Sequence, residues 1–145
     1  MGVDFAFLDS GTGGIPYMLA LKEKVPKASC VYLGDTARFP YGEKSPEQIT
    51  AAASEAVRLI LARWNPKTLI VACNTISVTA LDGLRSLFPN LPIVGTVPAI
   101  KLAAKVTRNK RVGLLATNAT VRHPYSQKLI LDFADRKSTR LNSSH

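Results

Sequence analysis

Residues 3–16 read VDFAFLDSGTGGIP, and this stretch decides the fold of the chain. The apolar run 3–8 predicts a strand, residues 9–14 form a polar turn rich in glycine, and Ile15 and Pro16 open a helix that reaches about Lys24. Proline suits the first helical turn, where its missing N–H loses no bond. A buried strand that passes through a glycine turn into a helix is typical of parallel α/β sheets.

The same alternation continues along the chain. Further strands are predicted at residues 30–33, 68–72, 93–95 and 111–116, and helices at 46–64, 77–87, 99–107 and 125–133. Ser45 and Gln48 predict a capping box, with Pro46 as the first helical residue. The fold class is therefore α/β, with a three-layer parallel-sheet domain of flavodoxin- or Rossmann-like type.

Composition excludes several classes of protein. The chain has 145 residues, 46% of them hydrophobic, which argues against intrinsic disorder. No apolar run approaches the roughly 20 residues of a membrane span. Residues 1–4 lack the basic segment of a secretory signal, and the chain has too few cysteines for a disulfide framework, so a reducing cytoplasm is expected. Two cysteines outside any CxxC pair and two histidines exclude a disulfide framework and a structural zinc site.

The net charge of +9 has two sources. Residues 136–145 are polar, basic and without periodicity, and we interpret them as a non-native tail from cloning or sequencing read-through that is expected to be disordered. An ordinary disordered C-terminus is the alternative. The basic residues between 101 and 111 form a solvated face, and no aromatic or groove-binding reader of nucleic acid accompanies them.

Four polar clusters follow predicted strands, at residues 9–10, 35–42, 73–75 and 117–120. Ligands bind at the carboxyl ends of the strands in open parallel sheets, so these clusters predict one shared site. The turn 11–14 matches neither a dinucleotide fingerprint nor a Walker A loop. It is either an anion site, for a carboxylate rather than a nucleotide, or a tight turn in which backbones approach closely.

Cys73 is the most informative of these residues. It lies between a strand and a helix, where helix amides can stabilise a thiolate that acts as nucleophile or base. A structural role is the alternative, and Cys30, inside a strand, has that role. Asp9 alone is best explained as a cap of its turn, but beside Cys73 it could form an acid–base pair. His123, the one histidine outside the tail, fits no cysteine-protease motif.

Residues 7–14, 32–45, 71–75 and 94–100 together resemble the glutamate racemase family, and the resemblance extends over about residues 3–134. It implies an isomerase that interconverts L- and D-glutamate for peptidoglycan synthesis, without metal or cofactor, by proton transfer between two cysteines. Cys73 would be one acid/base and Asp9 its electrostatic helper. The implied substrate-binding residues are Asp9, Ser10, Tyr41, Gly42, Asn74 and Thr75, together with Thr117 and Thr120.

Members of that family are nearly twice as long and carry their second cysteine in the second half. The resemblance therefore implies that residues 1–97 form a first α/β domain without its C-terminal return segment, and that residues 98–135 begin a second, pseudo-symmetric domain. The chain alone is expected to be inactive, and the full-length parent to be a homodimer. Two other functions are an aspartate racemase and a binding module with a partner such as DNA gyrase. The runs at residues 9–14 and 40–44 favour glutamate.

Overall fold

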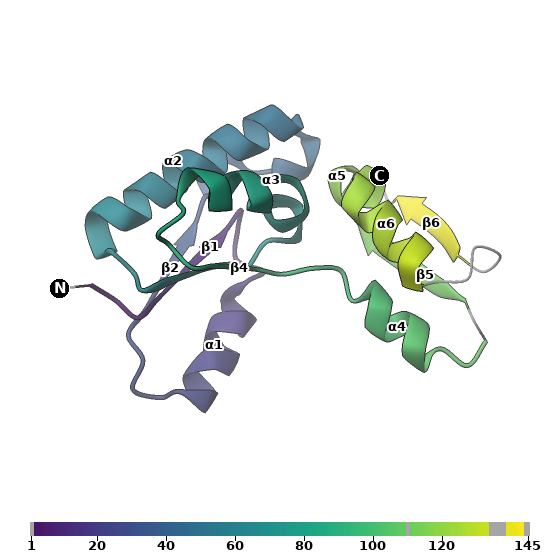
Figure 1. Cartoon of the computed structure of the whole chain (residues 1–145), viewed down its shortest axis with the longest axis horizontal. Coiled ribbons are helices and arrows are strands. Elements are labelled where there is room, and N and C mark those ends of the chain that lie inside the picture. Colours follow the sequence, from purple (N-terminus) through teal and green to yellow (C-terminus); the bar gives the residue numbers. More distant parts are fainter. Residues whose placement is uncertain (1, 110, 134–138, 144–145) are drawn as a thin grey trace.

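The structure, a computed structural model, describes residues 2–109, 111–133 and 139–143. A four-stranded parallel sheet forms its first lobe (Figure 1). The strands are β1 (Phe5–Asp9), β2 (Cys30–Gly34), β3 (Thr68–Val71) and β4 (Ile93–Gly95), in the spatial order β2-β1-β3-β4. The helices of this lobe are α1 (Ile15–Lys24), α2 (Pro46–Trp64) and α3 (Asn74–Leu87), with short 3-10 turns η1 (Thr36–Arg38) and η2 (Tyr41–Glu43).

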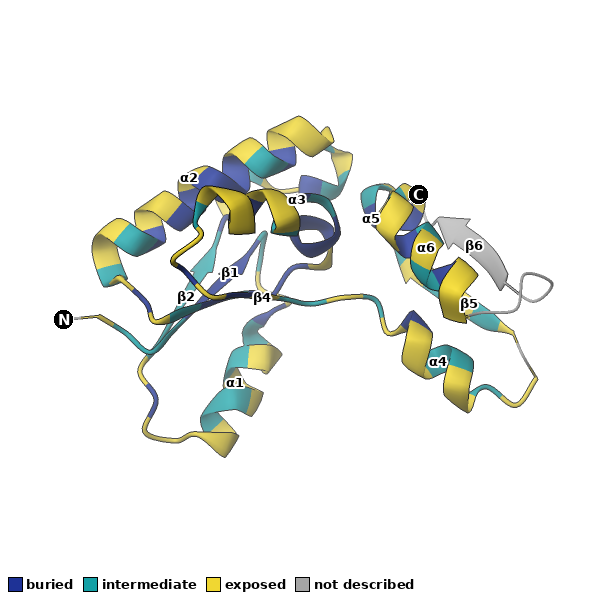
Figure 2. Cartoon of the chain, in the orientation of Figure 1, coloured by how far each residue is buried: buried dark blue, intermediate teal, exposed yellow. Residues whose placement is uncertain are grey.

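The helices cover the two faces of the sheet unequally. Helices α2 and α3 lie together on one face and α1 on the other (Figure 1). The core lies under α2 and α3, where the buried stripe of α2 packs on the central strands (Figure 2). No side chain of α1 is buried. The predicted α/β fold with helices on both faces of a parallel sheet is confirmed.

Local signals in the sequence explain how α2 begins and ends. The Ser45 hydroxyl accepts a bond from the Gln48 backbone N–H at 3.2 Å, and the Gln48 side chain accepts one from the Ser45 N–H at 3.0 Å. The predicted capping box is thus confirmed. The helix ends at Trp64, and the cap residue Asn65 has a φ of 37°, in the left-handed region that asparagine tolerates.

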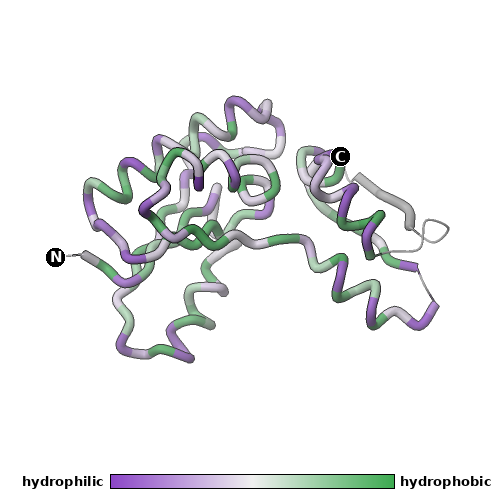
Figure 3. Tube along the Cα trace, in the orientation of Figure 1, coloured by the Kyte–Doolittle hydropathy of each residue, from purple (hydrophilic) through white to green (hydrophobic). Residues whose placement is uncertain are grey.

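A second, smaller lobe follows an extended segment after β4 (Figure 1). It contains α4 (Ile100–Val106), β5 (Val112–Ala116), α5 (Asn118–Arg122), α6 (Pro124–Phe133) and β6 (Thr139–Ser143). Strands β5 and β6 pair in parallel as a separate two-stranded sheet. Apolar colour runs along the strands of the first lobe and recurs on helices of both lobes (Figure 3).

The structure corrects three expectations. Helix α3 begins at Asn74, three residues before the predicted start, because Cys73 already takes the position before the first helical turn. Helix α5 was not predicted, since five residues give too short a pattern for periodicity. Thr139–Ser143 forms β6 against β5, so the expectation that this part of the tail is disordered is wrong. The other residues of the tail lie outside the described ranges.

The lobes meet where α5 approaches η2 and α3. The Thr75 and Thr117 hydroxyl oxygens lie 3.1 Å apart across this boundary. A Cβ atom at Gly42 would lie 2.7 Å from Cβ of Thr117, so only glycine permits this approach. Within the described ranges, no helix is both long and apolar enough to cross a membrane.

Candidate active site

A cavity of about 610 Å³ opens at the carboxyl edge of the sheet, beside α5. The turn after β1 and the residues after β3 form its floor, and the second lobe closes one side. It is lined by Asp9, Ser10, Gly11, Thr12, Gly13, Tyr17, Thr36, Phe39, Ala72, Cys73, Asn74, Thr75, Thr117 and Thr120. The polar clusters that follow β1, β3 and β5 therefore meet in one place, as their positions in the sequence predict.

Asp9 ends β1 and is 5% exposed. One carboxylate oxygen accepts the Ser10 backbone N–H at 2.7 Å, and the other accepts the Gly14 N–H at 2.8 Å and the Tyr32 hydroxyl at 2.7 Å. Hydrogen bonds to an ionised acceptor are stronger than neutral ones, so these three donors fix the carboxylate firmly. Asp9 therefore caps its own turn, the role that its position alone predicts.

Gly14, directly before α1, lies against Ala72 after β3 and Tyr32 of β2. A Cβ atom there would lie 2.5 Å from Cβ of Ala72 and 3.0 Å from the Tyr32 hydroxyl. The turn after β1 thus needs glycine for close backbone approach, which is one of the two alternatives left open by the sequence. Because the Gly14 N–H donates to Asp9, the anion held by this amide is a carboxylate of the protein itself.

Cys73 lies directly before α3 and is 7% exposed. Its Sγ atom is 3.5 Å from Oγ of Ser10, and both residues line the cavity. A thiolate at this position would lie at the positive end of the α3 dipole. The arrangement can remove or donate a proton at a ligand atom in the cavity.

Two tyrosines lie near this site, and both stay protonated. Burial raises the pKa of Tyr32, and the hydrogen bond to Asp9 raises it further. Burial also raises the pKa of Tyr41, whose hydroxyl donates to Asp35 at 2.5 Å. Arg38 donates to the same Asp35 oxygen at 2.9 Å and pairs with Glu55 on α2. This network anchors the loop between β2 and α2.

The predicted site residues separate into two groups. Those that line the cavity are Asp9, Ser10, Cys73, Asn74, Thr75, Thr117 and Thr120. Tyr41 and Gly42 do not line it, because the Tyr41 ring is buried behind the loop and Gly42 packs against Thr117. Thr75, Thr117 and Thr120 form a chain of hydroxyls, with 3.1 and 3.3 Å between successive oxygens.

The remaining candidates lie elsewhere. The Cys30 thiol donates to the Ala28 carbonyl at 3.8 Å, and burial raises its pKa. His123 accepts the Tyr125 backbone N–H at 3.2 Å and does not line the cavity. In the ranges that the structure describes, no three His, Cys, Asp or Glu side chains gather as a metal site would require.

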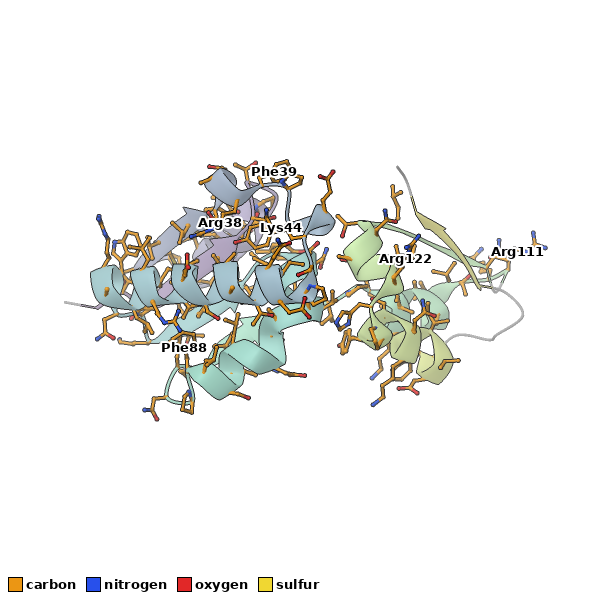
Figure 4. The ribbon with its side chains drawn as sticks, turned by 90° about the horizontal axis from the view of Figure 1, so that it is seen from above. Arg38, Phe39, Lys44, Phe88, Arg111 and Arg122 are labelled. Atoms are coloured by element: carbon orange, nitrogen blue, oxygen red, sulfur yellow. The ribbon has the colours of Figure 1, made fainter. Side chains whose placement is uncertain are left out.

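Sequence reasoning missed Tyr32 as a site residue, whereas Phe39 lies in the predicted cluster 35–42 and lines the cavity. Phe39 is 64% exposed, and Figure 4 shows it on the loop of the first lobe near Arg38, far from Arg111 of the second lobe. The sequence signal for Phe39 was its position before Pro40, in a long loop that follows a predicted strand. Tyr32 had a weaker one, as a tyrosine with a polar tip near the end of an apolar strand.

Comparison with known proteins identifies similar chains. A family model described as Asp/Glu/Hydantoin racemase matches residues 18–140. Glutamate racemase of Treponema pallidum (strain Nichols) is 46% identical over 129 residues, which are 89% of this chain and 48% of the relative. Glutamate racemase of Proteus mirabilis is 44% identical over 136 residues, 94% of this chain and 47% of the relative. The chain thus spans about half the length of the curated relatives it matches.

Solved structures agree with this result. Escherichia coli glutamate racemase, in complex with L-glutamate and the activator UDP-MurNAc-Ala, superposes with a TM-score of 0.89 at 38% identity. The match covers 98% of this chain and 53% of that one. Glutamate racemase from Aquifex pyrophilus gives a TM-score of 0.85 at 33% identity, over 97% of this chain and 54% of the other.

Proposed function

Because this chain belongs to the Asp/Glu/hydantoin racemase family, we propose that it supplies one half of the active site of a glutamate racemase. The observation that carries the proposal is the Cys73 thiol, held beside Ser10 on the floor of a hydroxyl-lined cavity. The names of the relatives and the L-glutamate bound by the E. coli protein support the substrate, and the length of the relatives supports the assignment of one half of the site.

In the proposed reaction, the Cys73 thiolate takes the α-proton of glutamate. The C–H bond breaks, its electron pair remains on the α-carbon, and the thiol forms. A second acid on the opposite face then returns a proton, which inverts the centre. Cys30 cannot be that acid, because its thiol donates to the Ala28 carbonyl and does not line the cavity. We propose that the second acid is the other cysteine of the two-cysteine mechanism, in the half of the relatives that this chain does not match.

The cavity would hold the carboxylates of glutamate through neutral groups. Among the described residues that line it, Asp9 is the one charged side chain, and no lysine or arginine is present. Hydroxyl and amide groups of Ser10, Asn74, Thr75, Thr117 and Thr120 would therefore bind the two carboxylates, and the Asp9 carboxylate would attract the ammonium group. For Tyr41 and Gly42 we propose supporting roles, Tyr41 as the anchor of the loop and Gly42 as the partner of Thr117.

We extend the proposal to the setting of the enzyme. It would act in the cytoplasm, in peptidoglycan synthesis, without a cofactor and as a homodimer. Residues 1–97 would belong to a first domain and 98–135 to the start of a second. The end of the four-stranded sheet at Gly95 and the separate pairing of β5 with β6 support this division.

Protection of the thiol tests the proposal on the chain itself. Alkylation of Cys73 by iodoacetamide, followed by peptide mass spectrometry, should slow in the presence of L- or D-glutamate, while alkylation of Cys30 in the same sample should not. L-Lysine serves as the control ligand. Stronger protection by aspartate would favour the aspartate racemase alternative, and equal protection by lysine would contradict an amino-acid dicarboxylate site.

A further inference from the structure

We propose that Tyr32 is a positioning residue of this site: its hydroxyl fixes and partly compensates the Asp9 carboxylate, so its loss would slow the reaction of the Cys73 thiol. This inference rests on the proposed function only for what Cys73 does once it is deprotonated. The coupling from Tyr32 through Asp9 to Cys73 is a property of the protein without substrate, and it can be measured without glutamate.

The first step is the bond between neighbouring strands. Tyr32 lies on β2 and pairs in register with Phe7 of β1. Its hydroxyl donates to Asp9 at 2.7 Å and lies 3.2 Å from the Gly11 carbonyl oxygen. The two other donors to Asp9 are amides of its own turn. Tyr32 therefore ties the turn to the next strand, whereas the amides only close the turn on itself.

The surroundings of the phenol are shaped to admit it. The missing side chain of Gly14 leaves the space that the Tyr32 oxygen and Ala72 occupy. The raised pKa of Tyr32 keeps its hydroxyl protonated, so it remains a donor across the neutral range. The contact thus has a reserved place and a fixed direction, as a positioning interaction requires.

The second step leads from Asp9 to Cys73. The Ser10 N–H donates to Asp9 at 2.7 Å, and Oγ of Ser10 lies 3.5 Å from Sγ of Cys73. Without the Tyr32 hydroxyl, Oδ2 of Asp9 would keep only the Gly14 N–H as a donor. Its negative charge would then be less compensated, and the carboxylate would be freer to turn. Both changes disfavour a second negative charge on Cys73, so the thiol would become a weaker acid.

The chemistry of the other groups around Cys73 sets them apart from Tyr32. Asp9 is the charged side chain of the cavity wall, and Tyr17 of α1 is the further titratable group there. The loop and α5 contribute Thr36, Phe39, Thr117 and Thr120, which do not titrate. Behind the wall, Asp35 is compensated by Arg38 and by the Tyr41 hydroxyl. Among the described residues around Cys73, Tyr32 is the one whose side chain donates to Asp9.

The test measures alkylation of Cys73 against pH in the full chain, with Cys30 as the internal standard. Tyr32→Phe should move the Cys73 profile to higher pH and slow the reaction at pH 7 about threefold, equivalent to roughly half a pKa unit. Tyr125→Phe is the matched control, because Tyr125 lies on α6 outside the cavity. A Tyr32→Phe profile that coincides with the original one would overturn the proposal. Faster reaction of both cysteines, the result of a merely loosened fold, would overturn it as well.

Two further measurements keep the test decisive. Asp9→Asn should speed Cys73 alkylation, and Tyr32→Phe should add nothing in that background, whereas an additive effect would overturn the route through Asp9. If Tyr32→Phe does not fold, uniform 3-fluorotyrosine provides a stronger phenol donor without removing it. Cys73 should then react faster, and an unchanged rate would again overturn the proposal. Failure of glutamate to protect Cys73 would contradict the proposed function alone.

Discussion

At the scale of single residues, the two thiols of the chain have different surroundings. Cys73 lies on a cavity floor beside a hydroxyl, and Cys30 lies in a strand against a backbone carbonyl. Two glycines near the cavity are required by packing, since Gly14 and Gly42 each leave room for a side chain from another element. Around the same cavity, Cys73 is therefore required for its thiol, and the two glycines are required for their small size.

This contrast predicts opposite results for two serine substitutions. In a chimera of this chain with the second half of the E. coli relative, Cys73→Ser should abolish racemisation, because a hydroxyl is far too weak an acid to supply a base near neutral pH. Cys30→Ser should keep the activity and lower the free energy of unfolding by about 1 kcal/mol. Circular dichroism of L-glutamate and urea unfolding measure the two effects, and the reverse pattern would refute the assignment of Cys73.

At the scale of elements, Asp4 joins the starts of three strands. Its carboxylate accepts the Ser29 N–H and hydroxyl before β2 and pairs with Lys67 before β3 at 2.8 Å. The hydrogen bond from Lys67, followed by those from Ser29, holds the pKa of Asp4 well below its usual range. The same bond raises the pKa of Lys67.

The lowered pKa of Asp4 predicts how stability depends on pH. A carboxyl whose pKa is lower in the folded state contributes stability above its unfolded pKa of about 4, and this contribution is lost as the pH falls through the folded value. Asp4→Asn should therefore reduce the urea midpoint at pH 7 but much less at the acid end of the range. Asp82→Asn, at an exposed helix site 3.7 Å from Arg85, is the control and should show no such trend.

Local signals determined which elements could be predicted from the sequence. Proline at the start of α1, the capping box of α2 and the apolar run of β3 each act within a few residues, so they are readable in one segment. The bond from Tyr32 to Asp9 joins residues 23 positions apart and depends on the register of β1 with β2. The position of α5 likewise depends on the Thr117 cap and its contact with Gly42. Such contacts exist only once the sheet has formed.

At the scale of the whole molecule, the two lobes differ in how well they bury apolar groups. The first lobe has a continuous core between its sheet and α2 with α3. The second exposes large side chains on β5, α4 and α6, with Leu115 at 78%. Apolar surface left in water withholds about 25 cal/mol per Å² of stabilisation, so the second lobe is the weaker of the two.

Hydrogen exchange should resolve this difference. Amides of β1, β3 and α2 should exchange by global unfolding, while those of α4, β5 and α6 should exchange through local opening at lower free energy. Mass spectrometry of peptides from the labelled chain gives both values in one experiment. Uniform protection through Phe133 would show that the lobes unfold as one unit.

The chain of hydroxyls formed by Thr75, Thr117 and Thr120 has a consequence for handedness. A hydroxyl can turn its proton without moving its oxygen, and it can donate or accept. An arginine fork has only donors in a fixed plane, so it would favour one arrangement of a ligand's groups. Because these hydroxyls can rotate, they can hydrogen-bond to either of two mirror-image ligands while their own oxygen atoms stay in place. The proposed racemisation requires both antipodes to be held, and in this cavity the adjustment between them would need only the movement of protons.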